Sequence, residues 1–265
     1  MYDRFNRSIN YLRISVTDRC NLRCSYCMPA SGIQLMEHDE ILSFEEIEEF
    51  TKLAVSRGIN KVRLTGGEPL VRKNIVQLVN RLALIEGLED LSMTTNGILL
   101  AKFAADLKAA GLKRVNISLD TVNPDRYCKI TRTGNIQDVF NGIEAAQKVG
   151  FNPIKINCVL LGEPDKEIEQ LRKYCAEKDL QLRFIHQMDL QSGEFSKVEG
   201  GEGGNCKRCN RVRLQANGNV KPCLFSDLAY NIRELGAEKA LDLAIGNKPK
   251  IGTYNKSGEF YSIGG

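Results

Sequence analysis

Histidine is scarce in this 265-residue chain, which contains only His38 and His186. Zinc sites usually need four ligands, drawn mostly from cysteine and histidine, so this scarcity argues against zinc. A zinc site is nevertheless an alternative for either of the two cysteine groups described below. His38 lies in a charged stretch and is expected to be solvated. His186 is expected at the end of a strand, where it could line a site.

Long apolar segments are also missing. No apolar run approaches the about 18 residues that a membrane-spanning helix requires. Residues 1–10 lack the apolar region of a secretory signal, which indicates a cytoplasmic protein. The net charge of +4 is mild, so it hints at anionic ligands but does not predict binding to nucleic acid.

Cysteine, by contrast, is plentiful. Nine cysteines in a chain expected in a reducing compartment indicate metal binding rather than disulfides, and an odd number cannot pair completely. Three of them, Cys128, Cys158 and Cys175, are isolated in the sequence and are expected to be small buried side chains. The other six form two groups, Cys20-x3-Cys24-x2-Cys27 and Cys206-x2-Cys209-x13-Cys223.

Each group of three cysteines has the ligands for an incomplete iron–sulfur site. Three thiolates in a short segment can hold three irons of a [4Fe–4S] cube and leave the fourth iron open. An open iron with no protein ligand can bind a small molecule. The two groups therefore predict two such clusters in one protein.

Short apolar strands alternate with longer amphipathic helices over the first two thirds of the chain. Six β/α repeats predict parallel strands with right-handed crossovers, closed into an incomplete (β/α)6 barrel of the TIM-like α/β class. The expected strands are Tyr11–Val16, Lys61–Thr65, Asp90–Thr94, Arg114–Leu119, Pro153–Leu160 and Gln181–Ile185. The expected helices are Phe44–Arg57, Lys73–Ile85, Leu99–Ala110, Ile136–Val149 and Lys166–Lys178.

Beyond this repeat the pattern changes. We predict a partial barrel over residues 1–190 and a Gly/Glu-rich linker over 191–205, where Glu-Gly-Gly-Glu-Gly-Gly suggests flexibility. Residues 206–265 would form a short C-terminal extension that binds the second cluster and needs it, together with the barrel, for order.

The expected strands carry polar side chains at every second position, and the apolar positions between them should face the helices. The polar set would then face the inside of the barrel. Cations packed there would repel one another and be poorly solvated, so a water-filled cavity for a multiply charged anion is expected. An antiparallel sheet with these residues in solvent is the alternative, which the helix after nearly every strand disfavours. The cations are Arg13, Lys61, Arg63, Lys155 and Arg183.

Two motifs together resemble the radical S-adenosylmethionine superfamily. The first cysteine group has an aromatic residue, Tyr26, before its last cysteine, and Gly66-Gly67-Glu68-Pro69 follows the second expected strand. The resemblance implies that Cys20, Cys24 and Cys27 hold a [4Fe–4S] cluster whose open iron binds S-adenosylmethionine. The two glycines would leave main-chain groups accessible to this cosubstrate.

Within that superfamily the chain is similar to the GTP 3′,8-cyclase family of molybdenum cofactor biosynthesis. The similar segments are Leu12–Cys20, Thr94–Gly97, Asn116–Asp120, Cys209–Leu214 and the terminal Gly264-Gly265. The second cysteine group also has that family's spacing.

The family resemblance assigns roles to individual residues. Cys206, Cys209 and Cys223 would hold a second [4Fe–4S] cluster whose open iron meets the guanine edge. S-adenosylmethionine would contact Tyr26, Gly66, Gly67, Glu68, Ser118 and Met188. GTP would contact Arg13, Lys61, Arg63, Thr94, Lys155, Arg183, Arg211 and Arg213. Gly264 and Gly265 would reach back into the active site as catalytic residues. Our own further hypothesis is that Arg211 or Arg213 steers the last reduction.

The implied reaction begins with reductive cleavage of S-adenosylmethionine to a 5′-deoxyadenosyl radical, which takes the hydrogen from C3′ of GTP. The carbon radical closes a bond to C8 of guanine, and reduction gives (8S)-3′,8-cyclo-7,8-dihydroguanosine 5′-triphosphate. A flavodoxin- or ferredoxin-type protein would supply the electron, and relatives are often homodimers.

The chain departs from the family at several places, including a shorter tail after Cys223. The segment between Phe195–Val198 and Cys206 is far shorter than in the family, and His186 stands where the family commonly has glutamate. A different nucleotide substrate is therefore an alternative. Two further alternatives are a radical enzyme that modifies a peptide and a two-cluster electron carrier.

Overall fold

A single curved sheet of nine strands, in the order β6-β5-β4-β3-β2-β1-β7-β8-β9, forms the centre of the protein. The computed structural model describes residues 1–162 and 164–256. Strands β1 to β6 are parallel, which confirms the expected α/β partial barrel. The strands are β1 (Tyr11–Ser15), β2 (Lys61–Thr65), β3 (Asp90–Thr95), β4 (Arg114–Ser118), β5 (Lys155–Leu160), β6 (Gln181–His186), β7 (Arg211–Leu214), β8 (Asn219–Lys221) and β9 (Tyr230–Asn231).

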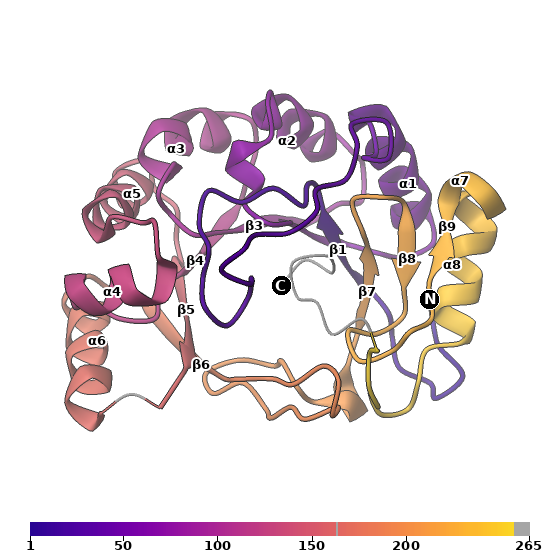
Figure 1. Ribbon diagram of the computed structural model, residues 1–265. Coiled ribbons are helices and arrows are strands. Elements are labelled where there is room, and N and C mark those ends of the chain that lie inside the picture. The colour runs from indigo at the N-terminus through magenta and orange to yellow at the C-terminus, as the bar shows by residue number, and fades with distance from the viewer. Residues whose placement is uncertain (163, 257–265) are drawn as a thin grey trace.

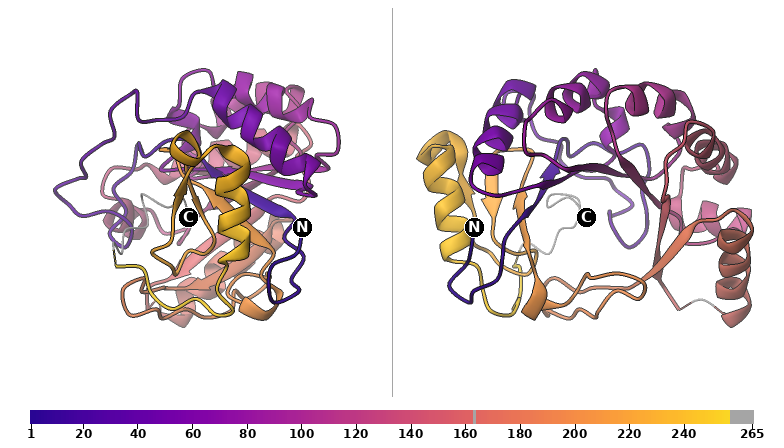
Figure 2. Two further views of the ribbon diagram at one scale, coloured as in Figure 1. Left: turned by 90° about the vertical axis from the view of Figure 1, so that its right-hand side faces the viewer. Right: turned by 180° about the vertical axis from the view of Figure 1, so that it is seen from behind.

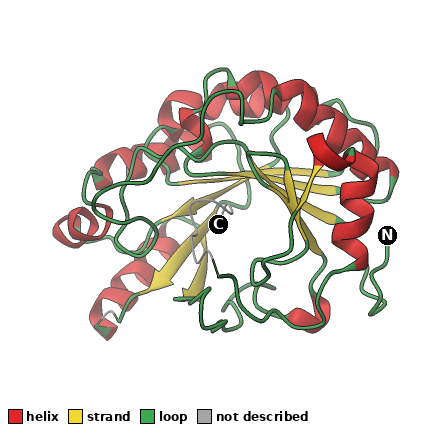
Figure 3. Cartoon of the chain, turned by 45° about the vertical axis from the view of Figure 1, so that its right-hand side comes forward, coloured by secondary structure: helices red, strands yellow, loops and turns green. Residues whose placement is uncertain are grey.

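The helices cover the outer, convex face of this sheet, and its inner face remains open toward the centre (Figures 1 and 3). All predicted strands and helices are present, with ends within two residues of those expected. Helix α4 and everything after β6 were not predicted as elements. The helices are α1 (Phe44–Ser56), α2 (Ile75–Ala83), α3 (Leu100–Ala109), α4 (Pro124–Thr131), α5 (Ile136–Lys148), α6 (Asp165–Glu177), α7 (Ile232–Leu235) and α8 (Ala237–Gly246), with 3-10 turns η1 (Pro69–Val71) and η2 (Cys206–Arg208).

The main hydrophobic core lies between the sheet and its outer helices. Leu12, Ile14, Val62 and Leu64 are fully buried there, and equivalent positions of the later strands join them. These are the apolar positions of the expected alternation, so the polar positions between them face the other side of the sheet. No helix in the described part of the chain is both long and apolar enough to span a membrane.

The C-terminal part of the chain is an extension of the same sheet. Strand β7 pairs in parallel with β1, and β8 and β9 follow as antiparallel strands. Residues 187–205, which we call the closing segment, run from β6 across to η2 and β7, opposite the middle of the sheet (Figures 1 and 2). Its Glu199 pairs with Phe184 of β6, and its Phe195 ring stacks 4.5 Å from Phe225.

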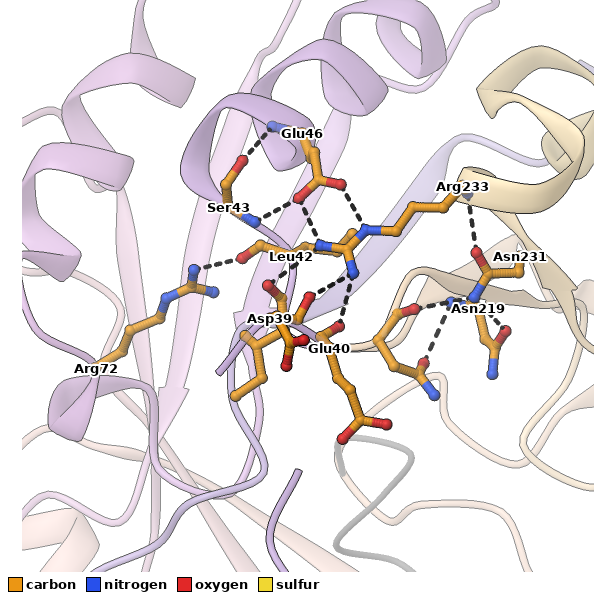
Figure 4. A network of polar contacts seen from close by, with 11 residues as sticks. Asp39, Glu40, Leu42, Ser43, Glu46, Arg72, Asn219, Asn231 and Arg233 are labelled. Atoms are coloured by element: carbon orange, nitrogen blue, oxygen red, sulfur yellow. Dashed lines mark hydrogen bonds and ion pairs between the residues drawn. The ribbon is translucent and has the colours of Figure 1, made fainter. Parts of the chain in front are cut away.

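A polar network fastens α7 to the barrel (Figure 4). Arg233 donates to both carboxylate oxygens of Glu46, at 2.6 and 2.9 Å, and to the carbonyls of Asp39 and Glu40. Glu46 also accepts from the Ser43 N–H at 2.7 Å, as part of the capping box that starts α1. Because α7 follows β9, this network holds the middle of the extension against the first helix of the barrel.

Candidate active site

The first cysteine loop leaves the end of β1 and packs directly on the turn that follows β2. The Gly67 N–H donates to the Thr17 carbonyl and the Glu68 N–H donates to the Arg19 carbonyl, each at 2.8 Å. A Cβ atom at position 67 would lie 2.3 Å from the Arg19 oxygen, and one at position 66 would lie 2.6 Å from the Thr17 oxygen. The close approach of these two backbones therefore requires both glycines.

Glu68 holds this turn to the next strand. Its Oε1 accepts from the Leu70 N–H at 3.0 Å and from the Thr95 hydroxyl at 2.8 Å, and its Oε2 accepts from the Asn96 N–H at 2.7 Å. The side chain is 1% exposed, and burial raises its pKa to about 7 against the opposing effect of these bonds. Glu68 thus positions the ends of β2 and β3 beside the first cysteine loop.

Helix α4, which the sequence analysis missed, supports the other side of the loop. The N–H groups of Arg23 and Ser25 donate to the carbonyls of Thr131 and Ile130. Arg132, just after α4, donates to the Arg23 carbonyl at 2.7 Å and to the Met28 carbonyl at 2.9 Å. With only eight residues, this helix is too short to show a clear apolar period. The sequence signal that could have predicted its start is the capping residue Asn123 followed by Pro124.

Tyr26 reaches from the loop to the opposite side of the barrel mouth. Its hydroxyl donates to Asp120 Oδ2 at 2.9 Å, and Asp120 Oδ1 accepts from the Val159 N–H at 2.8 Å. Asp120 therefore joins the first cysteine loop to the ends of β4 and β5. This link was not visible in the sequence because the three segments are far apart along the chain.

The three thiols of the first group are close enough to affect one another. Burial, the Asp120 carboxylate and the two neighbouring thiols raise the pKa of Cys24 to about 12. Burial and Cys20 raise the pKa of Cys27 to about 11. Metal coordination overcomes such shifts because a bound metal ion deprotonates the thiol outright.

The second cysteine group lies at the other end of the strands. Cys206 and Cys209 come just before β7, which is parallel to β1, whereas the first group follows the end of β1. Cys223 follows β8, which is antiparallel to β7 and so returns to the same end. The two groups therefore occupy opposite ends of the barrel interior.

The second group is surrounded by positive charge. Burial raises the pKa of Cys209, but the Lys248 ammonium, the Arg211 N–H and the charges of Arg211 and Arg213 together lower it below its usual value. All nine cysteines are free of disulfides, as a metal-binding role requires. Among the described residues, no three His, Cys, Asp or Glu side chains are grouped around one point as a single ion needs.

Between the two groups lies a wall of cations whose alignment follows from strand register. Arg13 of β1 pairs with Arg63 of β2 on one side and with Arg213 of β7 on the other. Neighbouring strands lie about 4.8 Å apart, so these three side chains stand in a row on the inner face. Arg183 and Lys155 stand on β6 and β5 across the interior.

Burial and the crowding of like charges lower the pKa values of these cationic groups. Burial and the neighbouring Arg213 hold the pKa of Arg13 well below its usual range. Burial and Arg211 lower that of Arg213 to about 10, while burial and nearby arginines lower that of Lys155 to about 8. Within the described chain, the buried Thr94 Oγ1, Arg183 Nε and Arg211 Nε atoms have no hydrogen-bond partner. Such unsatisfied donors suit an anionic ligand.

One cavity of about 800 Å³ joins all of these features. Both cysteine groups line it, as do the Gly66–Glu68 turn, Tyr26, Ser118 and Met188. Its wall includes Arg13, Lys61, Arg63, Thr94, Lys155, Arg183, Arg211 and Arg213. Gly200, Gly201, Gly203 and Gly204 of the closing segment complete it. The catalytic glycines expected at 264 and 265 lie outside the described residues.

The isolated histidines and cysteines differ in placement. His186 lines the cavity and lies 3.0 Å from Glu199 of the closing segment, whereas His38 is exposed, as expected. Cys158 and Cys175 are buried, as expected, but Cys128 is exposed. The expectation for Cys128 was wrong because it lies on the outer face of the unpredicted helix α4.

Sequence comparisons agree with the motifs. A model of the radical SAM superfamily matches residues 14–175. The chain is similar to GTP 3′,8-cyclases of Thermodesulfovibrio yellowstonii (44% identity over 282 residues, covering 89% of this chain and 88% of the relative) and Moorella thermoacetica (45% over 279, covering 88% and 86%). For that of Geobacter sulfurreducens the values are 40% over 303 residues, covering 94% and 93%. Each alignment is longer than this 265-residue chain, so these relatives carry internal residues that it lacks.

Solved structures at lower identity share the fold. Streptococcus suis SuiB bound to the precursor peptide SuiA superposes with a TM-score of 0.69 at 15% identity, covering 91% of this chain and 66% of SuiB. The enzyme anSMEcpe with bound AdoMet gives 0.66 at 18% identity, covering 90% and 81%. The sequence relatives are far closer than these structural ones. The chain therefore belongs to the radical SAM superfamily and, within it, to the GTP 3′,8-cyclase family.

Proposed function

We propose that this protein converts GTP to (8S)-3′,8-cyclo-7,8-dihydroguanosine 5′-triphosphate in molybdenum cofactor biosynthesis. S-adenosylmethionine would bind at the end of the cavity near Cys20, Cys24 and Cys27, and GTP at the end near Cys206, Cys209 and Cys223. The observation that carries the proposal is the single cavity lined by both cysteine groups with a row of arginines between them.

The donor sets suit two [4Fe–4S] clusters better than single ions. Each group offers three thiols without disulfides, and the chain has only His38 and His186 to supply a histidine as the fourth ligand for zinc. When bound, the first cluster supplies the electron that cleaves S-adenosylmethionine to a 5′-deoxyadenosyl radical. The chain's own part is to hold the reacting groups in line and keep water out.

The basic wall would position the nucleotide. Arg13, Arg63 and Arg213 present guanidinium groups in one row, and paired N–H donors of arginine match phosphate oxygens. The cavity of about 800 Å³ lies within the ~300–1,000 Å³ range of small-molecule sites. Arg211 and Arg213, which flank the second cysteine group, are the proposed residues for steering the last reduction.

The closing segment still lines the end of the cavity near the second cysteine group, although it is shorter than in the family. Phe195 stacks on Phe225, and a small apolar cluster around Leu190 and Phe225 includes Met188 and Cys223. This packing holds the closing segment against the cavity wall despite the missing residues, which supports a site of nucleotide size. A flavodoxin- or ferredoxin-type donor, a cytoplasmic location and a homodimer are further parts of the proposal.

Anaerobic incubation with S-adenosylmethionine, dithionite and GTP tests this function. We expect methionine, 5′-deoxyadenosine and the cyclised nucleotide in equal amounts. Formation of 5′-deoxyadenosine with GTP unconsumed would favour a peptide substrate. SuiB, which shares this fold, was solved with a bound precursor peptide. Intact clusters without any cleavage would favour an electron carrier.

A further inference from the structure

Lys248 is the most deeply buried cation of the C-terminal extension. It is neither a proposed cluster ligand nor a proposed nucleotide-binding residue. Its side chain is 2% exposed, among the largest fully buried side chains of the protein. Its Nζ donates to the Arg211 carbonyl at 2.6 Å and to the Pro222 carbonyl at 2.5 Å. Among the described residues, no carboxylate forms an ion pair with it. A buried ammonium without a counter-charge is costly, so another anion should lie close by.

The two carbonyls that Lys248 binds lie at the start of β7 and just after β8, next to cysteines of the second group. Arg211 is two residues after Cys209, and Pro222 directly precedes Cys223. The ammonium is therefore bonded to the backbone within two residues of both Cys209 and Cys223. Gly252, further along the same segment, would place a Cβ atom 3.4 Å from the Cys223 sulfur. The segment after α8 thus packs against the cysteine group itself.

Arg7 binds the backbone of the third cysteine of the group, Cys206, as Lys248 binds the backbone near the other two. Arg7 is 9% exposed, and its guanidinium donates to the Cys206 carbonyl at 2.8 Å. It also donates to the carbonyls of Pro249 and Lys250, at 2.7 and 3.1 Å. A buried ion pair of 2.6 Å with Asp3 holds Arg7 in place. Arg7 therefore fixes Cys206 and, at the same time, the segment that carries Lys248.

We infer that Arg7 and Lys248 form a cationic bracket that positions the second cysteine group, and that Lys248 also neutralises part of the charge of its cluster. Each of the three cysteine-bearing segments is held by one of these two buried cations. A cube bound by three thiolates is negatively charged, and more so after reduction, which gives Lys248 its missing counter-charge. This inference rests on the second cluster of the proposed function.

Lys248 should accordingly raise the reduction potential of the second cluster, because a nearby positive charge favours the more negative, reduced state. The test uses the full chain with Cys20, Cys24 and Cys27 replaced by alanine, so that every cluster signal comes from the second group. After anaerobic reconstitution this background should bind about four irons. Absence of a cluster there would refute the second cluster itself, and so separates failure of the proposed function from failure of the bracket.

In that background, Lys248→Met removes the charge and Lys248→Arg keeps it. We expect Lys248→Met to reduce the reduced-to-oxidised ratio at a fixed potential about tenfold, equivalent to a midpoint more negative by ~59 mV for one electron. Lys248→Arg should keep the midpoint of the background, as should Lys250→Met, which alters an exposed lysine of the same segment. Midpoints follow from potentiometric titration read by electron paramagnetic resonance.

An unchanged midpoint in Lys248→Met with a complete cluster would overturn the inference. If Lys248→Met binds too little iron to titrate, iron content becomes the readout. The bracket then predicts that Lys248→Arg recovers iron, and equally low iron in both variants would overturn it. Arg7→Met should likewise lower iron retention, while Arg4→Met, an exposed arginine of the same N-terminal turn, should not.

Discussion

At the scale of single residues, Gly67 shows how tightly the two motifs of the first cluster site are joined. Its N–H bonds to the loop that carries the cysteines, and its missing side chain lets that backbone approach. The sequence indicated that the glycine is needed for access to the main chain. The structure adds a steric reason, which is contact with Arg19.

Gly67→Ala should therefore displace the first cysteine loop. A Cβ atom 2.3 Å from a carbonyl oxygen lies far inside the ~3.5 Å contact distance of such atoms, so one backbone must move. We expect a severalfold loss of iron from the first cluster, measured as iron per chain in a variant that lacks the second cysteine group. Gly246→Ala is the control, since its Cβ atom meets nothing within 4 Å. Full iron content in Gly67→Ala would contradict this reading of the turn.

Residues with recognisable spacing were predictable, and residues that act through distant contacts were not. The cysteines and the polar positions of the strands follow local patterns, so their placement along one cavity could be anticipated. Asp120, Arg7 and Lys248 make contacts 37 to 242 residues away in sequence. Nothing in a single sequence links such pairs.

At the scale of elements, the Arg233 network shows what attaches the extension to the barrel (Figure 4). The hydrogen bonds from Arg233 lower the pKa of Glu46 to about 2. The Ser43 N–H adds to this effect, and burial opposes it. A carboxyl whose pKa is lowered by folding stabilises the protein above its unfolded pKa of 4.5. That contribution is lost as the pH falls from 4.5 toward 2.

Arg233→Met should reduce the free energy of unfolding by about 0.5–1 kcal/mol at neutral pH, since the pair is partly exposed. The difference in free energy of unfolding between Arg233→Met and the unsubstituted protein should shrink as the pH falls below 4.5. Glu46 then takes up a proton when the protein unfolds, which reduces the stabilisation that the ion pair provides. Urea denaturation of the cluster-free protein at several pH values measures it. Lys173→Met, in an exposed pair of 3.8 Å, is the control. A difference that stays constant down to pH 3 would contradict the assignment.

Elements with strong periodicity were predicted and short ones were not. The five expected helices and six strands have amphipathic or alternating patterns of five residues or more. Helix α4 has eight residues, and β8 and β9 have three and two, too few for a period to be recognised. Their positions are set by tertiary contacts, such as the pairing of β7 with β1.

At the scale of the whole molecule, the sheet brings two cysteine groups about 180 residues apart in sequence to the two ends of one cavity. The fold class could be predicted from the β/α repeat. The continuation of the sheet into β7 could not, although it is what completes the row of arginines. The closing segment then shields the open side with few residues.

The most direct test of the account is transfer of deuterium from GTP labelled at C3′. If both substrates share this cavity, single turnover under anaerobic conditions should place the label in 5′-deoxyadenosine, in step with formation of the cyclised nucleotide. Unlabelled 5′-deoxyadenosine, with the deuterium still on GTP, would contradict it.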